Sequence, residues 1–253
     1  MNIFFRVDAS SQIGSGHLVR CLTLAKALKQ KGAECKFVCM DHKDYLIKKI
    51  KKEDLKLILI PNINQSKSNT SRKKADLSYS NLIDVKWEID AKHTINALKN
   101  NKIDWLVVDH YGIDIRWEKK LRPYTKKIMV IDDLANRNHD CDLLLDQNLI
   151  ANFKNRYKNL IPKYCSTLLG PQYALLQNEY KKLHLSTPPR TGKVKNILVY
   201  FGGTNQNYLT EMVLFAFLKL NIKDIKLNLV FSSATYLNKK IKKLQNKNKN
   251  IKI

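Results

Sequence analysis

The sequence lacks the features that mark secreted, disulfide-bonded or membrane-spanning proteins. Its five cysteines form no C-x-x-C pair and no metal-binding spacing with histidine, so we expect reduced thiols and neither a disulfide framework nor a metal site. No apolar run approaches the ~20 residues of a membrane span. The run 1–7 has neither the length nor the cleavage site of a signal peptide. We therefore expect a soluble, cytoplasmic protein with no membrane partner.

Acidic residues are scarce relative to basic ones. The chain has 46 lysines and arginines against 22 aspartates and glutamates, a formal net charge of +24. A basic protein attracts polyanions, including nucleic acids and nucleotide phosphates. The lysines are spread along the chain among asparagine and isoleucine, without aromatic residues placed to stack on bases. We therefore expect solvated lysine-rich surfaces that help to attract anionic substrates, and keep nucleic-acid binding only as a minor alternative.

Short apolar, β-branched segments alternate with segments of helical periodicity, which is typical of an α/β protein. In the first helix apolar residues recur from Leu18 to Leu28, and Gly32 stands where a C-terminal cap belongs. A helix is expected at about 87–98, an exposed loop at 62–80, and strands at 2–7, 36–40, 55–60, 105–108, 128–131 and 143–145. Strands that are apolar on both faces indicate a parallel sheet covered on both sides.

A polar, proline-containing segment at 186–192 predicts a linker between domains. We expect an N-terminal Rossmann-like domain at 1–185 and a partial C-terminal one at 193–253. In the second domain strands are expected at 196–200 and 226–231, and helices at 209–220 and 236–244. Two parallel strands cannot bury both faces of a stable sheet. We therefore expect the second unit either to dock firmly on the first or to be a truncated form of a longer domain.

The segment VDASSQIGSGHLVR, residues 7–20, joins the first strand to the first helix. Gly14 and Gly16, with Ser15 between them, allow a tight turn and a close approach of the backbone to a ligand. Free amides at the start of the helix suit a diphosphate, although the third glycine of the dinucleotide fingerprint is missing. His17 stands at the helix start, where the dipole favours a neutral, proton-accepting ring. The alternative is a histidine that bonds only locally.

Asp8 and Arg20 flank this loop. Three roles are open for each of them: to orient His17, to bridge to phosphate, or to form a simple ion pair. A second polar segment, VVDHYG, follows the strand at 105–108. Because ligands bind at the carboxyl ends of parallel strands, we expect this segment to face the same crevice. Tyr111 offers a hydroxyl or an aromatic face to a sugar, or else caps the core, and His110 is a candidate to orient Asp109.

Polar or glycine residues follow further strands. The pair Asp132–Asp133 and the segment 146–148 carry carboxylates that either bond sugar hydroxyls and amides or cap local structure. Gly202, Gly203 and Thr204 repeat the strand-to-glycine pattern in the second domain. Alone this is a weak phosphate signal, but with the glycine loop of the first domain it indicates a second half of a nucleotide site.

Together these motifs resemble those of the UDP-2,4-diacetamido-2,4,6-trideoxy-β-L-altropyranose hydrolases. The resemblance extends from residue 1 to about 231 and rests on RVDASSQIGSGH at 6–17, DHYG at 109–112, the aspartate pair at 132–133, GPQYALL at 170–176 and FGGT at 201–204. These enzymes serve pseudaminic acid biosynthesis, and hence flagellin glycosylation, and are similar to MurG-like GT-B glycosyltransferases. The resemblance implies an α/β fold with two Rossmann-like parallel-sheet domains that face a cleft.

The resemblance also implies the reaction, which is inverting hydrolysis at the anomeric carbon, without a metal or cofactor, releasing UDP and the free sugar. The family's catalytic histidine falls on His17, which would hold or deprotonate the attacking water, and its active-site tyrosine falls on Tyr111. Backbone amides would stabilise the leaving diphosphate. The substrate-binding candidates are Asp8, Gly14, Ser15, Gly16, Arg20, Asp109, His110, Gly202, Gly203 and Thr204.

Family members continue with a serine/glycine loop, a glutamate that contacts the nucleotide and an active-site asparagine, which have no counterpart before Ile253. We therefore expect a C-terminally truncated chain in which the nucleotide half of the cleft is incomplete. Two alternatives remain open. A MurG-like glycosyltransferase would show an acceptor cleft above His17, and an inactive remnant or basic binding module would not respond to UDP. The sequence indicates no oligomeric state.

Overall fold

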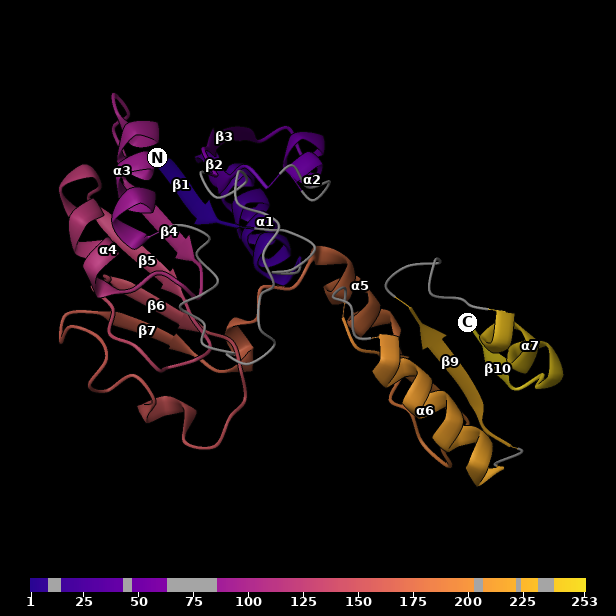
Figure 1. Ribbon diagram of the computed structural model, residues 1–253. Helices are drawn as coiled ribbons and strands as arrows, with labels where there is room; N and C mark the ends of the chain where they lie inside the picture. Colours follow the sequence, from indigo (N-terminus) through magenta and orange to yellow (C-terminus); the bar gives the residue numbers. More distant parts are fainter. Residues whose placement is uncertain (9–14, 43–46, 63–85, 203–206, 222–223, 232–238) are drawn as a thin grey trace. The chain divides into compact units, whose positions relative to one another are not determined.

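The computed structural model describes residues 1–8, 15–42, 47–62, 86–202, 207–221, 224–231 and 239–253, which form two units (Figure 1). The first unit is Met1–Lys181 and the second is Lys182–Ile253. Nearly all of the expected loop at 62–80 lies outside the described residues. Of the helices in the described ranges, none has the length and apolar character needed to cross a membrane.

A parallel sheet with the strand order β3-β2-β1-β4-β5-β6-β7 forms the centre of the first unit. The strands are β1 (Asn2–Val7), β2 (Glu34–Met40), β3 (Lys56–Ile60), β4 (Trp105–Asp109), β5 (Lys127–Ile131), β6 (Leu143–Asp146) and β7 (Ser166–Leu169). The first six confirm the expected strands, whereas β7 was not expected. The strand order changes direction between β1 and β4, and α/β proteins bind ligands outside the carboxyl ends of the strands at such a point.

Helices cover both faces of this sheet (Figure 1). They are α1 (Gly16–Gln30), α2 (Ile47–Lys52), α3 (Trp87–Leu98) and α4 (Ile115–Leu121), and α5 (Asn178–Ser186) spans the division between the units. In β1, Phe5 packs in the core beneath α1, and Phe4 packs in the core beneath α3 and α4. Both side chains are fully buried, which explains why this strand is apolar at successive positions.

The first helix ends as its sequence predicts. Gly32 has a φ of 83°, in the left-handed region that favours glycine. The amide of Ala33 bonds back to the carbonyl of Leu28 at 3.0 Å, and that of Gly32 bonds to Lys29 at 2.9 Å. The capped end leads directly into β2, so α1 is held against the sheet with its first turn at the carboxyl end of β1.

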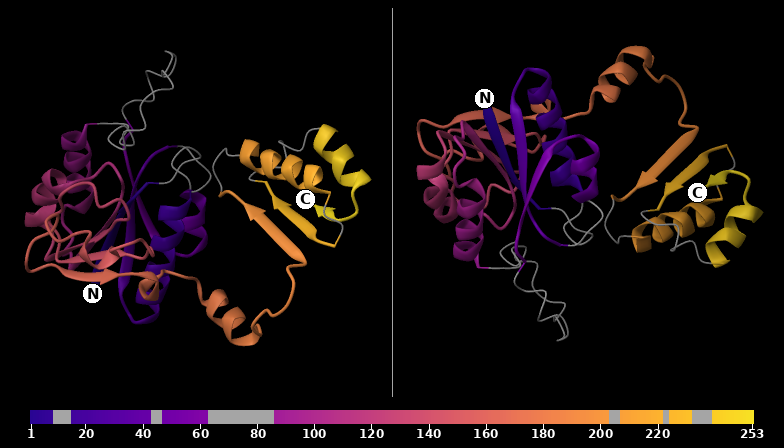
Figure 2. Two further views of the ribbon diagram at one scale, coloured as in Figure 1. Left: turned by 90° about the horizontal axis from the view of Figure 1, so that it is seen from below. Right: turned by 90° about the horizontal axis from the view of Figure 1, so that it is seen from above.

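The second unit contains a smaller parallel sheet of order β10-β9-β8, built from β8 (Asn196–Tyr200), β9 (Lys226–Val230) and β10 (Ile251–Lys252). Figure 2 shows α6 (Asn207–Leu220) and α7 (Lys239–Lys247) on one face of it. Leu198 and Tyr200 on β8 are exposed, whereas Val199 between them is buried. The short strand β10 was not expected, because its lysine- and asparagine-rich surroundings resemble a tail.

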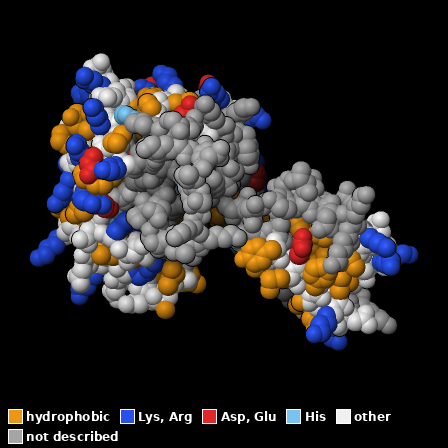
Figure 3. All heavy atoms as spheres, in the orientation of Figure 1, with side chains coloured by type: hydrophobic (Ala, Val, Ile, Leu, Met, Phe, Trp, Pro, Cys, Tyr) orange, Lys and Arg blue, Asp and Glu red, His pale blue; other side chains and the backbone are white. Residues whose placement is uncertain are grey.

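The basic side chains are dispersed on the face of the molecule shown in Figure 3. Among the residues drawn in colour, the lysines and arginines stand next to hydrophobic and uncharged groups. This distribution agrees with the solvated lysine-rich surfaces expected from the sequence.

Candidate active site

Aspartates stand at the carboxyl ends of neighbouring strands in the first unit. β1 is followed by Asp8, β4 ends at Asp109, β5 is followed by Asp132, and β6 ends at Asp146. All four are at most 2% exposed. A buried carboxylate is costly unless charged or hydrogen-bonding partners surround it. The partners of each aspartate therefore decide what this edge of the sheet can do.

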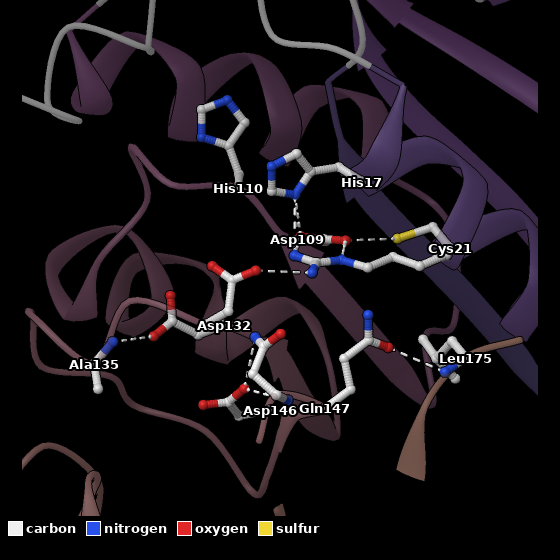
Figure 4. A network of polar contacts seen from close by, with 12 residues as sticks. His17, Cys21, Asp109, His110, Asp132, Ala135, Asp146, Gln147 and Leu175 are labelled. Atoms are coloured by element: carbon white, nitrogen blue, oxygen red, sulfur yellow. Dashed lines mark hydrogen bonds and ion pairs between the residues drawn. The ribbon is translucent and has the colours of Figure 1, made fainter. Parts of the chain in front are cut away.

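His17 lies in the first turn of α1 and contacts the end of β4. Its Nδ1 is 2.5 Å from Oδ1 of Asp109, and the two side chains are 9% and 0% exposed. Since the carboxylate can only accept, Nδ1 carries the proton and donates it to Asp109. The basic lone pair of a neutral ring is then on Nε2, on the side of the ring away from Asp109 (Figure 4).

Further side chains of α1 converge on the same carboxylate. Arg20 binds Asp109 with two bonds of 2.6 Å, from Nε to Oδ2 and from Nη2 to Oδ1, and the thiol of Cys21 lies 3.5 Å from Oδ2 (Figure 4). His17, Arg20 and Cys21 are spaced three and four residues apart and so share one face of the helix. Burial alone raises the pKa of Asp109, but hydrogen bonds from Arg20 and the charge of His17 hold it well below its usual range. Asp109 therefore stays a carboxylate.

Tyr111 packs against His17 from the loop after β4. The two ring centroids are 4.4 Å apart at an interplanar angle of 83°, an edge-to-face contact. Burial, followed by the charge of Asp133 and a hydrogen bond to its carboxylate, raises the pKa of Tyr111. The phenol is therefore neutral at physiological pH and donates its proton to Asp133.

Asp8 belongs to a neighbouring buried network. Its two oxygens accept bonds of 2.5 and 2.9 Å from Arg6, and Arg6 also pairs with Asp90 of α3 at 2.5 Å. Nε2 of His110 lies 3.2 Å from Asp8, and Nδ1 of His110 accepts the amide of Gly112 at 3.0 Å. Burial alone raises the pKa of Asp8, but Arg6 and His110 bring it well below the usual range. The partner of His110 is thus Asp8, and not Asp109 as the sequence suggested.

The aspartates after β5 and β6 stabilise the loops around them. Asp132 accepts the amide of Ala135 at 2.9 Å (Figure 4) and the hydroxyl of Tyr157 at 3.0 Å, and pairs with Arg137 at 2.9 Å. Asp146 accepts Arg156 at 2.5 Å and the same tyrosine at 3.2 Å. These contacts agree with the alternative in which Asp132 and Asp146 cap local structure. Tyr157 and the two arginines gave no sequence signal, because the loop residues are far from any recognisable motif.

Some predicted site residues lie elsewhere. Gly14, Gly203 and Thr204 are outside the described residues. Ser15 is the N-cap residue of α1 and makes no side-chain capping bond, and a Cβ added at Gly16 would have no neighbour among the described residues within 4 Å. Gly202, in the second unit, has a φ of 88°, which favours glycine. In the first unit the structure therefore brings together His17, Arg20, Asp109 and Tyr111, with Asp8 and His110 in the adjoining network.

Solved structures with the same fold define its class. No protein-family model matches the chain. MurG of Acinetobacter baumannii is similar with a TM-score of 0.53 at 13% identity, over 100% of this chain and 66% of that one. The UDP-GlcNAc 2-epimerase of Neisseria meningitidis, bound to UDP-GlcNAc, has a TM-score of 0.52 at 11% identity, over 100% of this chain and 71% of that one. The chain thus has the α/β GT-B fold with Rossmann-like domains.

Two proteins are also similar to the chain in sequence. The UDP-2,4-diacetamido-2,4,6-trideoxy-β-L-altropyranose hydrolase of Campylobacter jejuni is 28% identical over 100% of this chain and 77% of that protein. An uncharacterised protein of Methanocaldococcus jannaschii is 27% identical over 91% of this chain and 42% of its own length. The first match covers the whole chain and confirms the family resemblance that the motifs indicated.

Proposed function

We propose that the chain hydrolyses a UDP-linked diacetamido trideoxy sugar at its anomeric carbon. The products are UDP and the free sugar, which serves pseudaminic acid biosynthesis. The observation that carries this proposal is the 2.5 Å contact between His17 and Asp109 in the first turn of α1. A buried histidine–carboxylate pair at the start of a helix combines a proton acceptor with a site for a diphosphate. The Campylobacter relative supplies the substrate class.

In this reaction His17 activates the attacking water. Water attacks the anomeric carbon, the bond between that carbon and the diphosphate oxygen breaks, and Nε2 of His17 accepts the proton of the water. Asp109 keeps the proton on Nδ1 and stabilises the imidazolium that forms, as an orienting carboxylate does in other histidine bases. A positioned general base of this kind typically contributes about 10²- to 10⁴-fold to the rate. Attack from the face opposite to UDP inverts the anomeric centre.

The first turn of α1 receives the leaving group. The initial amides of a helix have no partner within the helix, and its dipole makes this end positive. Charge that develops on the departing UDP is stabilised by such fixed groups. Gly16 has no side chain to obstruct them. Arg20 is committed to Asp109 and Asp133, so we assign it to orienting the carboxylates and not to binding phosphate. The reaction as proposed uses no metal ion.

We also propose that the protein acts in the cytoplasm, in a reducing compartment. All five cysteines are free thiols, and four of them are buried. Burial raises the pKa of Cys21, Cys35 and Cys39, that of Cys35 to about 11. Thiols of this kind are unreactive packing groups.

The test is NMR of the purified chain mixed with the UDP-linked diacetamido altrose. We expect free UDP in the phosphorus spectrum, and the inverted anomer as the first sugar signal in the proton spectrum. EDTA should leave the rate unchanged. His17→Gln should lose turnover but bind UDP with nearly unchanged affinity, whereas the matched variant His184→Gln, at an exposed position of α5, should behave as the parent.

Other outcomes would overturn parts of the proposal. A folded parent chain that binds UDP but releases no sugar would contradict the hydrolase activity. Transfer of the sugar to an added acceptor, with no free sugar formed, would favour a MurG-like glycosyltransferase. A rate that EDTA abolishes and a divalent cation restores would contradict the metal-independent step.

A further inference from the structure

The carboxylate of Asp133 lies where two residues of the site meet. Nη1 of Arg20 donates to Oδ2 of Asp133 at 3.1 Å, and the hydroxyl of Tyr111 bonds to the same carboxylate. Asp133 directly follows Asp132, yet the two differ in their partners. The carboxylate of Asp132 is taken up by its own loop and by Tyr157, whereas that of Asp133 reaches across to α1 and to the loop after β4.

These contacts complete a closed ring of side chains. From Asp133 the ring continues through Arg20 to Asp109 at 2.6 Å, and from Asp109 to Nδ1 of His17 at 2.5 Å. The rings of His17 and Tyr111 meet edge to face at 4.4 Å, and Tyr111 returns to Asp133. The imidazole is therefore held from two directions, by Asp109 through a hydrogen bond and by Tyr111 through ring packing.

The backbone at this position is also fixed. Nη2 of Arg156 donates to the carbonyl oxygen of Asp133 at 3.0 Å, and its Nη1 is anchored on Asp146 at 2.5 Å. The side chain of Asp133 is only 18% exposed. A carboxylate on a fixed backbone that is bonded to both an arginine and a tyrosine has little freedom to move.

We propose that Asp133 is a positioning residue of the site. Its carboxylate holds the Tyr111 hydroxyl and the Arg20 guanidinium at the same time, and Tyr111 in turn fixes the plane of the His17 imidazole. Asp133 takes no proton in the reaction. The inference rests on the proposed function only for its effect on turnover, because the orientation of His17 is a property of the free protein.

The chemistry of the contact explains how a carboxylate serves both partners. A carboxylate only accepts, so it can satisfy two donors that approach from different sides. Asparagine has the same size but presents one oxygen and one NH₂ group. Its oxygen can still accept from Arg20, but its NH₂ group can meet the Tyr111 oxygen only as a donor. Asp133→Asn therefore keeps the volume, removes the negative charge and reverses or breaks the bond to Tyr111, while Arg20 stays bound to Asp109.

The first experiment needs no substrate. The ring nitrogens of His17 are observed by ¹⁵N NMR over a pH titration, with the signal assigned by its loss in His17→Gln. In the parent we expect a single tautomer protonated on Nδ1. Asp133→Asn and Tyr111→Phe should both shift these signals in the same direction, and the double variant should shift them no further than either one. Non-additivity is expected because both variants break the same contact.

The second experiment is kinetic and uses a matched control. We expect Asp133→Asn and Tyr111→Phe each to lower kcat about 10-fold with KM nearly unchanged, because a slightly misoriented base affects chemistry and not binding. Asp133→Glu should recover part of the loss. The control is Asp140→Asn, since Asp140 also joins an arginine to a tyrosine, with bonds of 3.1 Å from Arg122 and 2.8 Å from Tyr164. It should leave both kcat and the His17 signals unchanged.

Three results would overturn the inference. One is a loss of thermal stability in Asp133→Asn with unchanged His17 signals and unchanged kcat, which would make the residue purely structural. Another is strict additivity of the two variants. If Asp133→Asn fails to fold, Tyr111→Phe decides, and unchanged His17 signals in that variant would contradict the ring. Absence of turnover in the parent would refute the proposed function, while the NMR result would still test Asp133.

Discussion

The two edges of the first-unit sheet carry similar residues in different surroundings. At the carboxyl edge, the side chains of Arg6, Asp8 and Asp109 are at most 2% exposed, and that of Arg20 is 11% exposed. At the amino edge, Glu34 pairs with Lys56 and Asp104 with Lys126, and the two lysines are 72% and 61% exposed. The same kinds of ion pair are therefore desolvated at one edge and hydrated at the other.

This difference in burial changes what each ion pair contributes to stability. An exposed ion pair contributes only about 0–1 kcal/mol, because water screens it and two long side chains must be ordered. A buried pair gives little net stability, but removing one partner costs about 3–5 kcal/mol because a buried charge is left alone. The carboxyl edge therefore holds its side chains in one geometry, as the role proposed for His17 requires, whereas the ion pairs of the amino edge stay in contact with water.

The largest expected effect is that of Asp109→Asn. The amide no longer fixes the proton on Nδ1 of His17 and leaves the guanidinium of Arg20 without its main partner. We expect kcat to fall about 10²- to 10⁴-fold and the free energy of unfolding to fall by about 3–5 kcal/mol, measured by turnover and urea denaturation. If Glu34→Gln at the amino edge were equally damaging, the contrast between the edges would be wrong.

Arg6→Met should come next, with an effect on stability. It leaves Asp8 and Asp90 buried without their shared cation, so we expect about 3–5 kcal/mol of destabilisation. Arg122 also binds two aspartates, Asp140 and Asp142, but its side chain is 26% exposed. Arg122→Met should therefore cost less than Arg6→Met in the same urea titration. Equal losses would show that burial does not govern these networks.

Acidification should weaken the carboxyl edge progressively. The pKa values of Asp8, Asp109 and Asp132 are lowered in the folded chain, so their charges stabilise it above the unfolded value of about 3.9. This contribution is lost as the pH falls from about 5 through the lowered folded values. We expect the stability difference between the parent and Asp109→Asn to shrink over this range in urea titrations. A constant difference would contradict the lowered pKa of Asp109.

Gly16→Val should produce a smaller and more selective effect. The space beside Gly16 is free of described protein atoms, so the thermal unfolding temperature should change little. Valine would nevertheless push a diphosphate away from the first amides of α1. We expect UDP to bind about 10-fold more weakly by calorimetry, a loss of about 1.4 kcal/mol. An unchanged affinity for UDP would show that the diphosphate does not bind at the start of α1.

Added salt should have the smallest effect. At about 1 M salt the Debye length falls to roughly 3 Å, so exposed pairs are screened while buried ones are not. We expect the stability contributed by Glu34 to disappear, whereas the loss caused by Asp109→Asn persists. If the loss of stability caused by Asp109→Asn also vanished in salt, the charges of the carboxyl edge would be hydrated in solution.

Much of the fold could be predicted from the sequence because its signals are local. The apolar runs predicted β1 to β6, the periodicity predicted α1 and α3, and Gly32 marked the end of α1. β7 and β10 escaped prediction because they are short and their burial depends on neighbouring strands. Arg6 and Cys21 escaped as members of the site because a charge within an apolar strand and a thiol on a helix show no role until their partners are known.

The sequence by itself determined the α/β class, the family resemblance and the position of His17 at the start of a helix. Only the tertiary structure decided that Asp109, 92 residues away, is the partner of His17, and that Asp133, 113 residues from Arg20, binds it. It also paired His110 with Asp8. The physical reason is that the order of strands in the sheet determines which strand ends meet. That order is set by packing and long-range pairing, which no local pattern of residues records.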